Sequence, residues 1–160
     1  MGRISPVERI PHNQEMKNED NPWWYKFQEL NEETVEGYVG FVYKITNLET
    51  KRKYIGKKIL KFTRRKSIKG QKRRKKVVLD SDWREYYGSN KELKQDVETL
   101  GPEKFIREVL KLCKSKSEMS YWEAHFQFKY DVLLSDDYYN SWISCKIHKS
   151  NLRLTLDIEE

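Results

Sequence analysis

The chain has 160 residues, of which 37% are hydrophobic, 36% charged and 13% aromatic, and its formal net charge is +7. The length fits one domain with a core of its own, and the aromatic content argues against a disordered chain. No segment approaches the ~20 apolar residues of a membrane span, and the N-terminus lacks the apolar stretch of a signal peptide. Cys113 and Cys145 have neither metal-ligand nor disulfide-framework spacing. We therefore expect a soluble cytoplasmic protein with no membrane partner, not a secreted disulfide scaffold.

The positive charge is concentrated in residues 51–76, which hold fifteen Lys or Arg and no acid. Of the 32 bases of the chain, 17 therefore lie elsewhere, against all 25 acids, which leaves the rest of the chain with a net charge of −8. A block of one sign repels itself and is typical of a nucleic-acid contact. A solvated face without a partner is the simpler alternative.

Residues 1–36 are predicted to form an N-terminal arm. Its first 21 residues are polar and show little periodicity. The aromatic segment Pro22–Phe27 is expected to pack across the domain and fix the arm in place. Stacking of these rings on nucleic-acid bases is the alternative interpretation.

Residues 37–58 are predicted to form a β-hairpin, because two stretches rich in β-branched and aromatic residues flank a turn at 47–50. A loop centred on this turn would place Tyr43 directly opposite Tyr54, with both phenols on one face and their β-carbons ~5 Å apart. Gly56 falls on the same face, where its missing side chain allows close approach. Packing alone could explain the two tyrosines, since cross-strand aromatic pairs stabilise many sheets.

Residues 57–82 are predicted to form a basic insertion. This stretch shows no apolar periodicity up to residue 76, so we expect a mobile loop in the free protein. Its side chains would neutralise phosphates and position a duplex without reading its sequence. The candidate contacts are Lys57, Lys58, Arg64, Arg65, Lys72, Arg73, Arg74 and Lys75.

The second half of the chain is predicted to contain helix, strand and helix, after a short helix or turn at 80–90. Asn90 can cap a helix whose apolar stripe is formed by residues 93, 97 and 100, and Gly101-Pro102 ends it. Residues 105–112 form a short and mostly apolar stretch, which indicates a buried third strand. A capping box at Ser115–Glu118 begins a helix that runs to about residue 130.

Together these elements predict an α/β fold, a small three-stranded mixed or antiparallel sheet flanked by helices. The domain would span residues 37–148 and a loose acidic tail residues 149–160. Met119, Trp122 and Phe126 would face the core from the last helix, with Glu123 at the border of that face.

Two short motifs carry a resemblance to a known family. Gly40-Phe41-Val42-Tyr43, followed after ten residues by Tyr54-Ile55-Gly56, resembles the signature of the GIY-YIG nucleases, although Phe41-Val42 stands where the family has one residue. The Trp-x-x-Tyr-Tyr-Gly-Ser sequence at 83–89 is similar to phage-encoded, homing-endonuclease-like members. The resemblance covers about residues 37–147 and implies the small α/β sandwich of that family.

The resemblance also implies an activity, the hydrolysis of phosphodiester bonds in double-stranded DNA. On this basis Tyr43 would activate water, Tyr54 would position the water or the phosphate, and Tyr86 would support the water. Glu123 matches the family's metal-binding glutamate on the helix after the third strand, and would hold Mg²⁺ or Mn²⁺. Asn140, after a tyrosine, matches a further family feature.

A cation that stabilises the phosphate is the least certain match, and Arg84 is our choice for it. Arg84 could instead pair with Asp80 or Glu85, just as Glu123 could be a surface acid and Asn140 could cap a turn. The rival cations are Lys57, Lys58, Arg64 and Arg65.

The main prediction is thus a metal-dependent DNA endonuclease, which a homodimer that cuts both strands would suit. A phage or mobile-element origin would place it in the cytoplasm of the host cell. The alternative is a non-catalytic module that binds nucleic acid through residues 51–76, in which the tyrosines only pack the sheet. Metal-dependent nicking of DNA separates the two.

Overall fold

The computed structural model describes residues 21–152. The first 20 residues of the predicted arm, and residues 153–160 of the predicted tail, lie outside the described residues. Within the described part, no helix combines the length and the apolar character that a membrane crossing needs.

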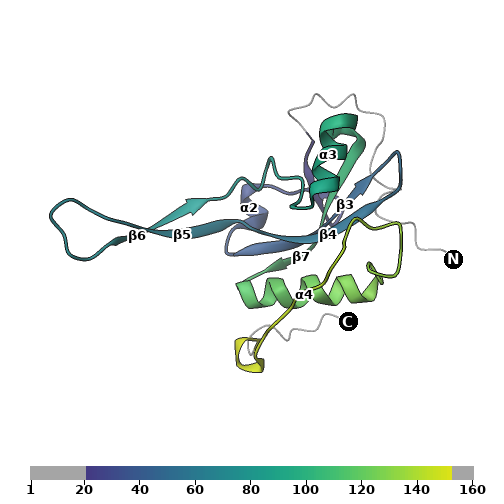
Figure 1. The fold of residues 1–160 in the computed structure, drawn as a ribbon. Coiled ribbons are helices and arrows are strands. Elements are labelled where there is room, and N and C mark those ends of the chain that lie inside the picture. Colours follow the sequence, from purple (N-terminus) through teal and green to yellow (C-terminus); the bar gives the residue numbers. More distant parts are fainter. Residues whose placement is uncertain (1–20, 153–160) are drawn as a thin grey trace.

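The centre of the fold is a five-stranded mixed sheet with the order β2-β1-β7-β3-β4 (Figure 1). β3 (Gly40–Asn47) pairs antiparallel with both β4 (Lys53–Ile59) and β7 (Phe105–Cys113). β1 (Trp23–Tyr25) continues the sheet parallel to β7, and β2 (Gln28–Glu29) closes that side. The predicted strands β3, β4 and β7 are therefore present, but the sheet is larger than the three strands expected.

Of the two additional strands, β1 comes from the aromatic segment, which we expected to pack across the domain rather than to pair in its sheet, and β2 follows that segment directly. Trp23 is 2% exposed, and its indole Nε1 donates a hydrogen bond to the backbone oxygen of Trp83 at 2.6 Å. Burial of so large an apolar side chain contributes about 2–3 kcal/mol. The segment is thus part of the core.

Three α-helices and two short 3₁₀ helices complete the described part of the chain. α4 (Lys116–Lys129) covers one face of the sheet, and α3 lies on the opposite side (Figure 1). The predicted caps are confirmed, because Asn90 accepts from the Leu93 N–H at 3.0 Å and Ser115 accepts from the Glu118 N–H at 3.1 Å. The other helices are α2 (Glu32–Val35), α3 (Lys91–Leu100), η1 (Pro102–Lys104) and η2 (Lys149–Leu152).

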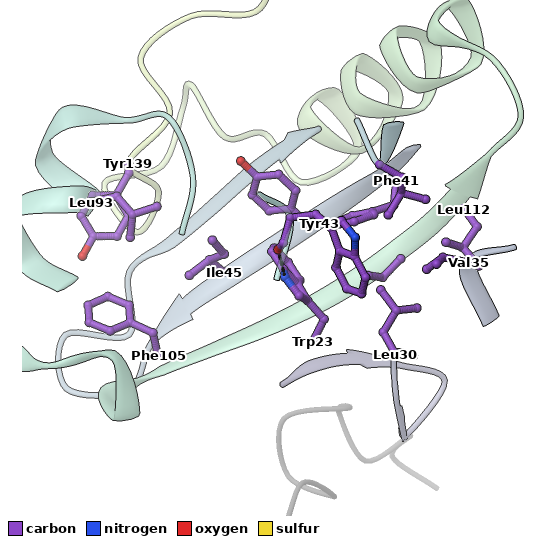
Figure 2. Close-up of a cluster of buried hydrophobic side chains, with 13 residues drawn as sticks. Trp23, Leu30, Val35, Phe41, Tyr43, Ile45, Leu93, Phe105, Leu112 and Tyr139 are labelled. Carbon is purple, nitrogen blue, oxygen red and sulfur yellow. Dashed lines mark hydrogen bonds between the residues drawn. The ribbon is translucent and has the colours of Figure 1, made fainter. Parts of the chain in front are cut away.

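Strand alternation divides the core between the two faces of the sheet. Phe41, Tyr43 and Ile45 pack with Trp23 on the face that α3 covers (Figure 2). On the other face, which α4 covers, Val42, Ile55 and Cys113 pack with Met119 of α4 and with Val132, which follows that helix. Figure 2 shows the rings of Trp23, Phe41 and Tyr43 next to one another, and their centroids lie 4.9–6.2 Å apart.

The register of the β3–β4 hairpin differs from the predicted one by two residues. Tyr43 pairs with Gly56 and Tyr54 pairs with Ile45, so the two tyrosines are diagonal neighbours instead of direct partners. The connection is longer than expected because the side-chain oxygen of Asn47 accepts hydrogen bonds from the Glu49 and Thr50 N–H groups and so fixes a wider loop. Asn47 itself is fully buried. A shift by two keeps both phenols on one face, as predicted, with ring centroids 6.1 Å apart.

The basic insertion is also different from the prediction, because it is a β-hairpin and not an irregular loop. β5 (Lys61–Lys66) and β6 (Lys75–Asp80) pair antiparallel in a separate two-stranded sheet that projects away from the domain (Figure 1). Phe62, Val77 and Leu79 lie on one face of it and are each partly buried. This short apolar alternation was hidden in the sequence among the surrounding lysines and arginines.

Candidate active site

A pocket opens along the outer edge of β4, the last strand of the five-stranded sheet. Residues 137–140 run beside this edge, where the Lys53 N–H donates to Asp137 O and the Tyr139 N–H donates to Lys53 O, both at 2.7 Å. Four segments therefore meet at the pocket: β4, the chain before α3, the helix α4 and the chain after it. The lining residues are Tyr54, Lys57, Ser89, Asn90, Glu123, Gln127, Asn140, Ser141, Trp142 and Ser144.

Two of the lining residues reach the pocket from opposite faces of β4. Tyr54 pairs with Ile45 and extends from the α3 side, whereas Lys57 pairs with Val42 and extends from the α4 side. The Tyr54 hydroxyl lies 3.1 Å from the Ser89 hydroxyl. Burial raises the pKa of Tyr54 above its ordinary value of 10.0, and the bond to Ser89 only partly opposes this. Tyr54 therefore offers the pocket a neutral hydroxyl.

Lys57 and Glu123 form an ion pair inside the pocket. Lys57 Nζ lies 3.4 Å from Glu123 Oε1 and donates to the Ser120 hydroxyl at 2.9 Å. The Glu123 side chain is 15% exposed, and burial raises the pKa of Glu123 above its ordinary value, against the lowering effect of Lys57. A partly buried carboxylate with a single partner among the described residues retains unused acceptor capacity, which suits a ligand.

Asn140 is held by the free edge of β4. Its Oδ1 accepts from the Ile55 N–H at 3.0 Å, and its Nδ2 donates to Ile55 O at 2.8 Å. Gln127, one helical turn after Glu123, donates to the same carbonyl at 3.1 Å. Asn140 therefore bonds the edge of β4 as a neighbouring strand would, and it connects β4 to the segment that follows α4.

Tyr43 does not line the pocket. It is fully buried behind Gly56, and among the described residues its hydroxyl has no hydrogen-bond partner. Burial, followed by the charges of Tyr86 and Tyr54, raises the pKa of Tyr43 well above its ordinary value. Loss of a proton from this phenol is therefore unfavourable in this arrangement, and the base role that the sequence resemblance implied for Tyr43 stays a prediction.

Tyr86 and Lys58 form a second layer next to Tyr43, also outside the pocket lining. The Tyr86 ring lies edge-on to Tyr43 at 5.9 Å, and Lys58 Nζ lies 3.9 Å from the centre of the Tyr86 ring. Lys58 also pairs with Asp82 at 2.5 Å, and this hydrogen bond lowers the pKa of Asp82. The Lys58 ammonium therefore already has a carboxylate partner within the domain, whereas a phosphate contact needs a cation that is free to bind.

Arg84 is directed away from the pocket. Its guanidinium pairs with Glu32 of α2 and lies 4.4 Å from the Trp83 ring centre. A different arginine organises this turn: Arg107, 3% exposed, donates to the backbone oxygens of Arg84 at 2.7 Å and Tyr86 at 3.0 Å, and burial lowers its pKa to about 10. Among the predicted cations, Lys57 is the one that lines the pocket.

Comparison with known families matches this arrangement to a nuclease domain. A family model described as "Putative endonuclease segE, GIY-YIG domain" matches residues 23–143. The chain belongs to the GIY-YIG endonuclease family. No curated protein and no solved structure matches it. The matched region of this GIY-YIG domain begins at the strand β1 and ends just after the segment that carries Asn140.

Several residues that line the pocket were missed by the sequence analysis. Gln127 could have been found, because it follows Glu123 by four residues and therefore shares its helix face. Ser89 ends the Trp-x-x-Tyr-Tyr-Gly-Ser run at 83–89, but the resemblance assigned it no role. Trp142 enters the pocket only through the packing of distant segments, and no local signal marks it. Trp142 is 71% exposed at the rim of the pocket.

The donor set of the GIY-YIG pocket fits a weakly chelated hard cation. Glu123 is the one carboxylate among the lining residues, and the described residues contain no group of three or more His, Cys, Asp or Glu that could hold a metal. Mg²⁺ is commonly held by one or two carboxylates, with waters and substrate phosphates completing its octahedron. Glu123 meets that requirement, whereas the ligand set of a structural zinc site is missing from this pocket.

Proposed function

We propose that the protein is a metal-dependent DNA endonuclease that hydrolyses phosphodiester bonds at the β4-edge pocket. The observation that carries this proposal is the convergence of Tyr54, Lys57 and Glu123 on one pocket in a GIY-YIG domain. Hydrolysis forms a bond between a water oxygen and phosphorus, and it breaks the bond between phosphorus and one ester oxygen. The site must therefore orient the water, bind the charged phosphate and stabilise the leaving oxygen.

Each of the three side chains fits one of these tasks. The Lys57 ammonium has donors left beside its bonds to Glu123 and Ser120, and it would bind a non-bridging phosphate oxygen. The neutral Tyr54 hydroxyl would orient the water, whose proton leaves to solvent through the open pocket. Glu123 would hold the cation, which supplies Lewis-acid stabilisation of the phosphate and the leaving oxygen.

Tyr43 and Asn140 would act as positioning residues in this scheme. Tyr43 packs against Tyr54 and fills the space over Gly56, so that it fixes the strand that carries Tyr54 and Lys57. Asn140 fixes the same strand from its outer edge. Neither proposed role requires the residue to touch the phosphate.

Double-stranded DNA is the substrate that the charge favours. The β5–β6 hairpin directly continues the strand of the pocket, and its outer half carries basic side chains that are exposed to solvent. Such side chains release counterions when they neutralise phosphates, which gives affinity without sequence readout. A phage or mobile-element origin and a homodimer remain predictions from the sequence resemblance.

The proposal is tested by incubating supercoiled plasmid with the wild-type protein, with Mg²⁺ or with chelator, and measuring nicked and linear forms. Glu123→Ala should abolish cleavage. The matched control is Glu98→Ala, which removes an exposed helical glutamate of α3 and should cut like the wild type. Cleavage by Glu123→Ala, or cleavage by the wild type in chelator, would contradict the proposal.

A non-catalytic binding module is the second candidate, and the position of Arg84 favours it. The cation that we expected at the phosphate instead pairs with Glu32, and Lys57 is already paired with Glu123. A family member that has lost its phosphate-binding arginine could retain DNA without cutting it. Tight binding by the wild type without nicking in Mg²⁺ or Mn²⁺ would support this function.

A further inference from the structure

The outer half of the β5–β6 hairpin places like charges directly opposite one another. Arg65 pairs across the ladder with Lys76, and Lys66 pairs with Lys75. All four side chains are exposed. Like charges in direct register destabilise an antiparallel pair. A bound polyanion would remove this repulsion, so the outer half has the charge arrangement of a ligand-binding element.

The inner half of the hairpin has a different composition, which anchors it. Lys61 pairs with Asp80, with Nζ and Oδ1 3.9 Å apart, and is therefore partly neutralised. Phe62 faces Leu79 across the ladder, and Arg64 lies over the Phe62 ring at 5.6 Å. The apolar and paired residues thus keep the ribbon folded at its base, while the unpaired cations are concentrated toward its tip.

We propose that this hairpin enters the major groove of double-stranded DNA, which rests on the proposed function and specifies how that substrate is held. Paired strands lie about 4.8 Å apart, and the major groove, about 12 Å wide, admits a two-stranded ribbon with its side chains. The minor groove of undistorted B-DNA, about 6 Å wide, is too narrow for the ribbon, which could enter it only if the duplex were bent and the groove widened. The major groove of duplex RNA is deep and narrow, so the ribbon selects DNA.

The alternation of the strands suits this position, because cations extend from both faces of the ribbon. Lys66 and Lys75 extend from one face, and Arg65 and Lys76 from the other, so each face can meet one of the two phosphate walls. The tip, residues 67–74, carries arginines that can form bidentate bonds with guanine in the floor of the groove. Its basic residues are Lys69, Lys72, Arg73 and Arg74.

The length of the ribbon sets where the contacted base pairs lie. Nine steps of nearly continuous extended chain lead from Lys57 in the pocket to Lys66. They span at most about 30 Å, or roughly nine base pairs of B-DNA. The base pairs read by the tip are therefore displaced from the phosphate at the pocket, on one side of it.

The test measures binding of the full chain in chelator, so that no cleavage occurs, to labelled duplexes of about 30 base pairs, which exceed the reach of the ribbon. One duplex is unmodified, one carries a bulky substituent at C5 of every pyrimidine, which fills the major groove, and one is saturated with distamycin in the minor groove. We expect about tenfold weaker binding to the C5-substituted duplex and less than about twofold change with distamycin. Equal binding to the unmodified and C5-substituted duplexes, or displacement by distamycin, would overturn the proposal. So would duplex RNA or single-stranded DNA that competes as well as duplex DNA.

A charge reversal separates the hairpin from general electrostatics. Arg65→Glu with Lys66→Glu places acids opposite Lys76 and Lys75, which favours the folded hairpin while removing its affinity for phosphate. We expect this double variant to bind at least about tenfold more weakly and to lose the preference for the unmodified duplex over the C5-substituted one. The control is Lys104→Glu with Lys129→Glu, the same change in net charge at exposed sites outside the hairpin and the pocket. An equal loss in both double variants would overturn the groove assignment.

The proposed function and this inference fail separately. If the protein binds DNA through the major groove in chelator but does not nick plasmid with a metal ion, the hairpin proposal holds and the catalytic proposal fails. If the protein nicks plasmid with a metal ion but shows no preference for the open major groove, the catalytic proposal holds and the hairpin proposal fails.

Discussion

The phenolic oxygen of Tyr43 occupies the space where Gly56, its cross-strand partner, has no side chain. A β-carbon on Gly56 would lie 2.5 Å from this oxygen and 2.7 Å from the ring carbon that bears it. The Gly56 of the family motif thus permits the close packing of a buried tyrosine against the strand of the pocket. The pairing of Tyr43 with Gly56 gives both motif residues a packing role that assigns no chemistry to Tyr43.

Gly56→Ala should therefore destabilise the fold by overpacking. Tyr43 is fully buried and has no open space to move into, so we expect a loss of about 1–3 kcal/mol in the free energy of unfolding. Urea denaturation measures this loss. Tyr43→Phe removes the atom that clashes, and it should recover part of the stability in the double variant. A Gly56→Ala protein as stable as the wild type would contradict the packing argument.

Tyr43→Phe alone tests whether the buried hydroxyl has a chemical role. The hydroxyl has no hydrogen-bond partner among the described residues, and a buried unsatisfied group costs about 1–3 kcal/mol. The variant should therefore be as stable as the wild type or more stable, and it should nick plasmid within about threefold of the wild-type rate. A large loss of nicking at unchanged stability would show that the Tyr43 hydroxyl takes part in the reaction.

Replacing each of the two candidate cations by alanine should affect the nicking rate very differently. Lys57→Ala removes the ammonium from the pocket, and we expect nicking to fall by about 10²-fold, as for loss of one preorganised electrostatic group. Arg84→Ala breaks an exposed pair with Glu32 and should change nicking by less than about threefold. Initial nicking rates at matched protein concentrations measure both. The reverse order of effects would show that Arg84 reaches the phosphate when DNA binds.

The pKa of Glu123 predicts a dependence of stability on pH. Burial raises this pKa above 4.5 in the folded protein, so the folded state binds the proton more tightly than the unfolded chain. Glu123 therefore favours folding fully below about pH 4.5, and this contribution is lost as the pH rises through the folded pKa. Glu123→Gln does not titrate, so the wild type should lose stability relative to the variant over that range.

Urea unfolding in chelator, at a series of pH values, measures this difference. In Lys57→Met the opposing effect of the lysine is gone, so the loss should occur at higher pH than in the wild type. A difference between the wild type and Glu123→Gln that is constant with pH would contradict the raised pKa.

Asn140→Ala should lower stability and activity together. It leaves the Ile55 N–H without its partner and removes one of two donors to Ile55 O, at a cost of about 1–3 kcal/mol. Nicking should fall in proportion to the loss of folded protein at the assay temperature. Hydrogen exchange of the Ile55 amide, faster in the variant, locates the effect. Full stability with no activity would indicate direct contact between Asn140 and the substrate.

The parts of the fold that depend on local sequence were predictable. The caps of α3 and α4 are made by Asn90 and Ser115 with residues three positions later, so their signals lie within one turn. The period-two alternation of the predicted hairpin likewise placed Tyr43 and Tyr54 on one sheet face. Glu123 was located correctly in the last helix, beside residues that face the core.

The remaining parts depend on contacts between distant segments. The hairpin register follows from Asn47, whose bonds with the Glu49 and Thr50 N–H groups are local, but whose side chain is held by a hydrogen bond that it donates to the hydroxyl of Tyr139, 92 residues away, at 3.0 Å. The direction of Arg84 depends on a turn that Arg107 holds from the middle of β7. Neither contact has a local signal, so sequence periodicity could supply the strands but not their register or the cation of the site.

The salt dependence of DNA binding should identify which basic residues touch phosphates. Each neutralised phosphate contributes about −0.9 to the slope of log binding constant against log salt concentration. If the four exposed cations in like-charge register each contact one phosphate, their replacement by glutamine should make the slope less steep by about 3–4. Binding isotherms in chelator at several salt concentrations measure it. An unchanged slope would mean that the hairpin does not contact the backbone, and that the affinity for DNA comes from another surface of the domain.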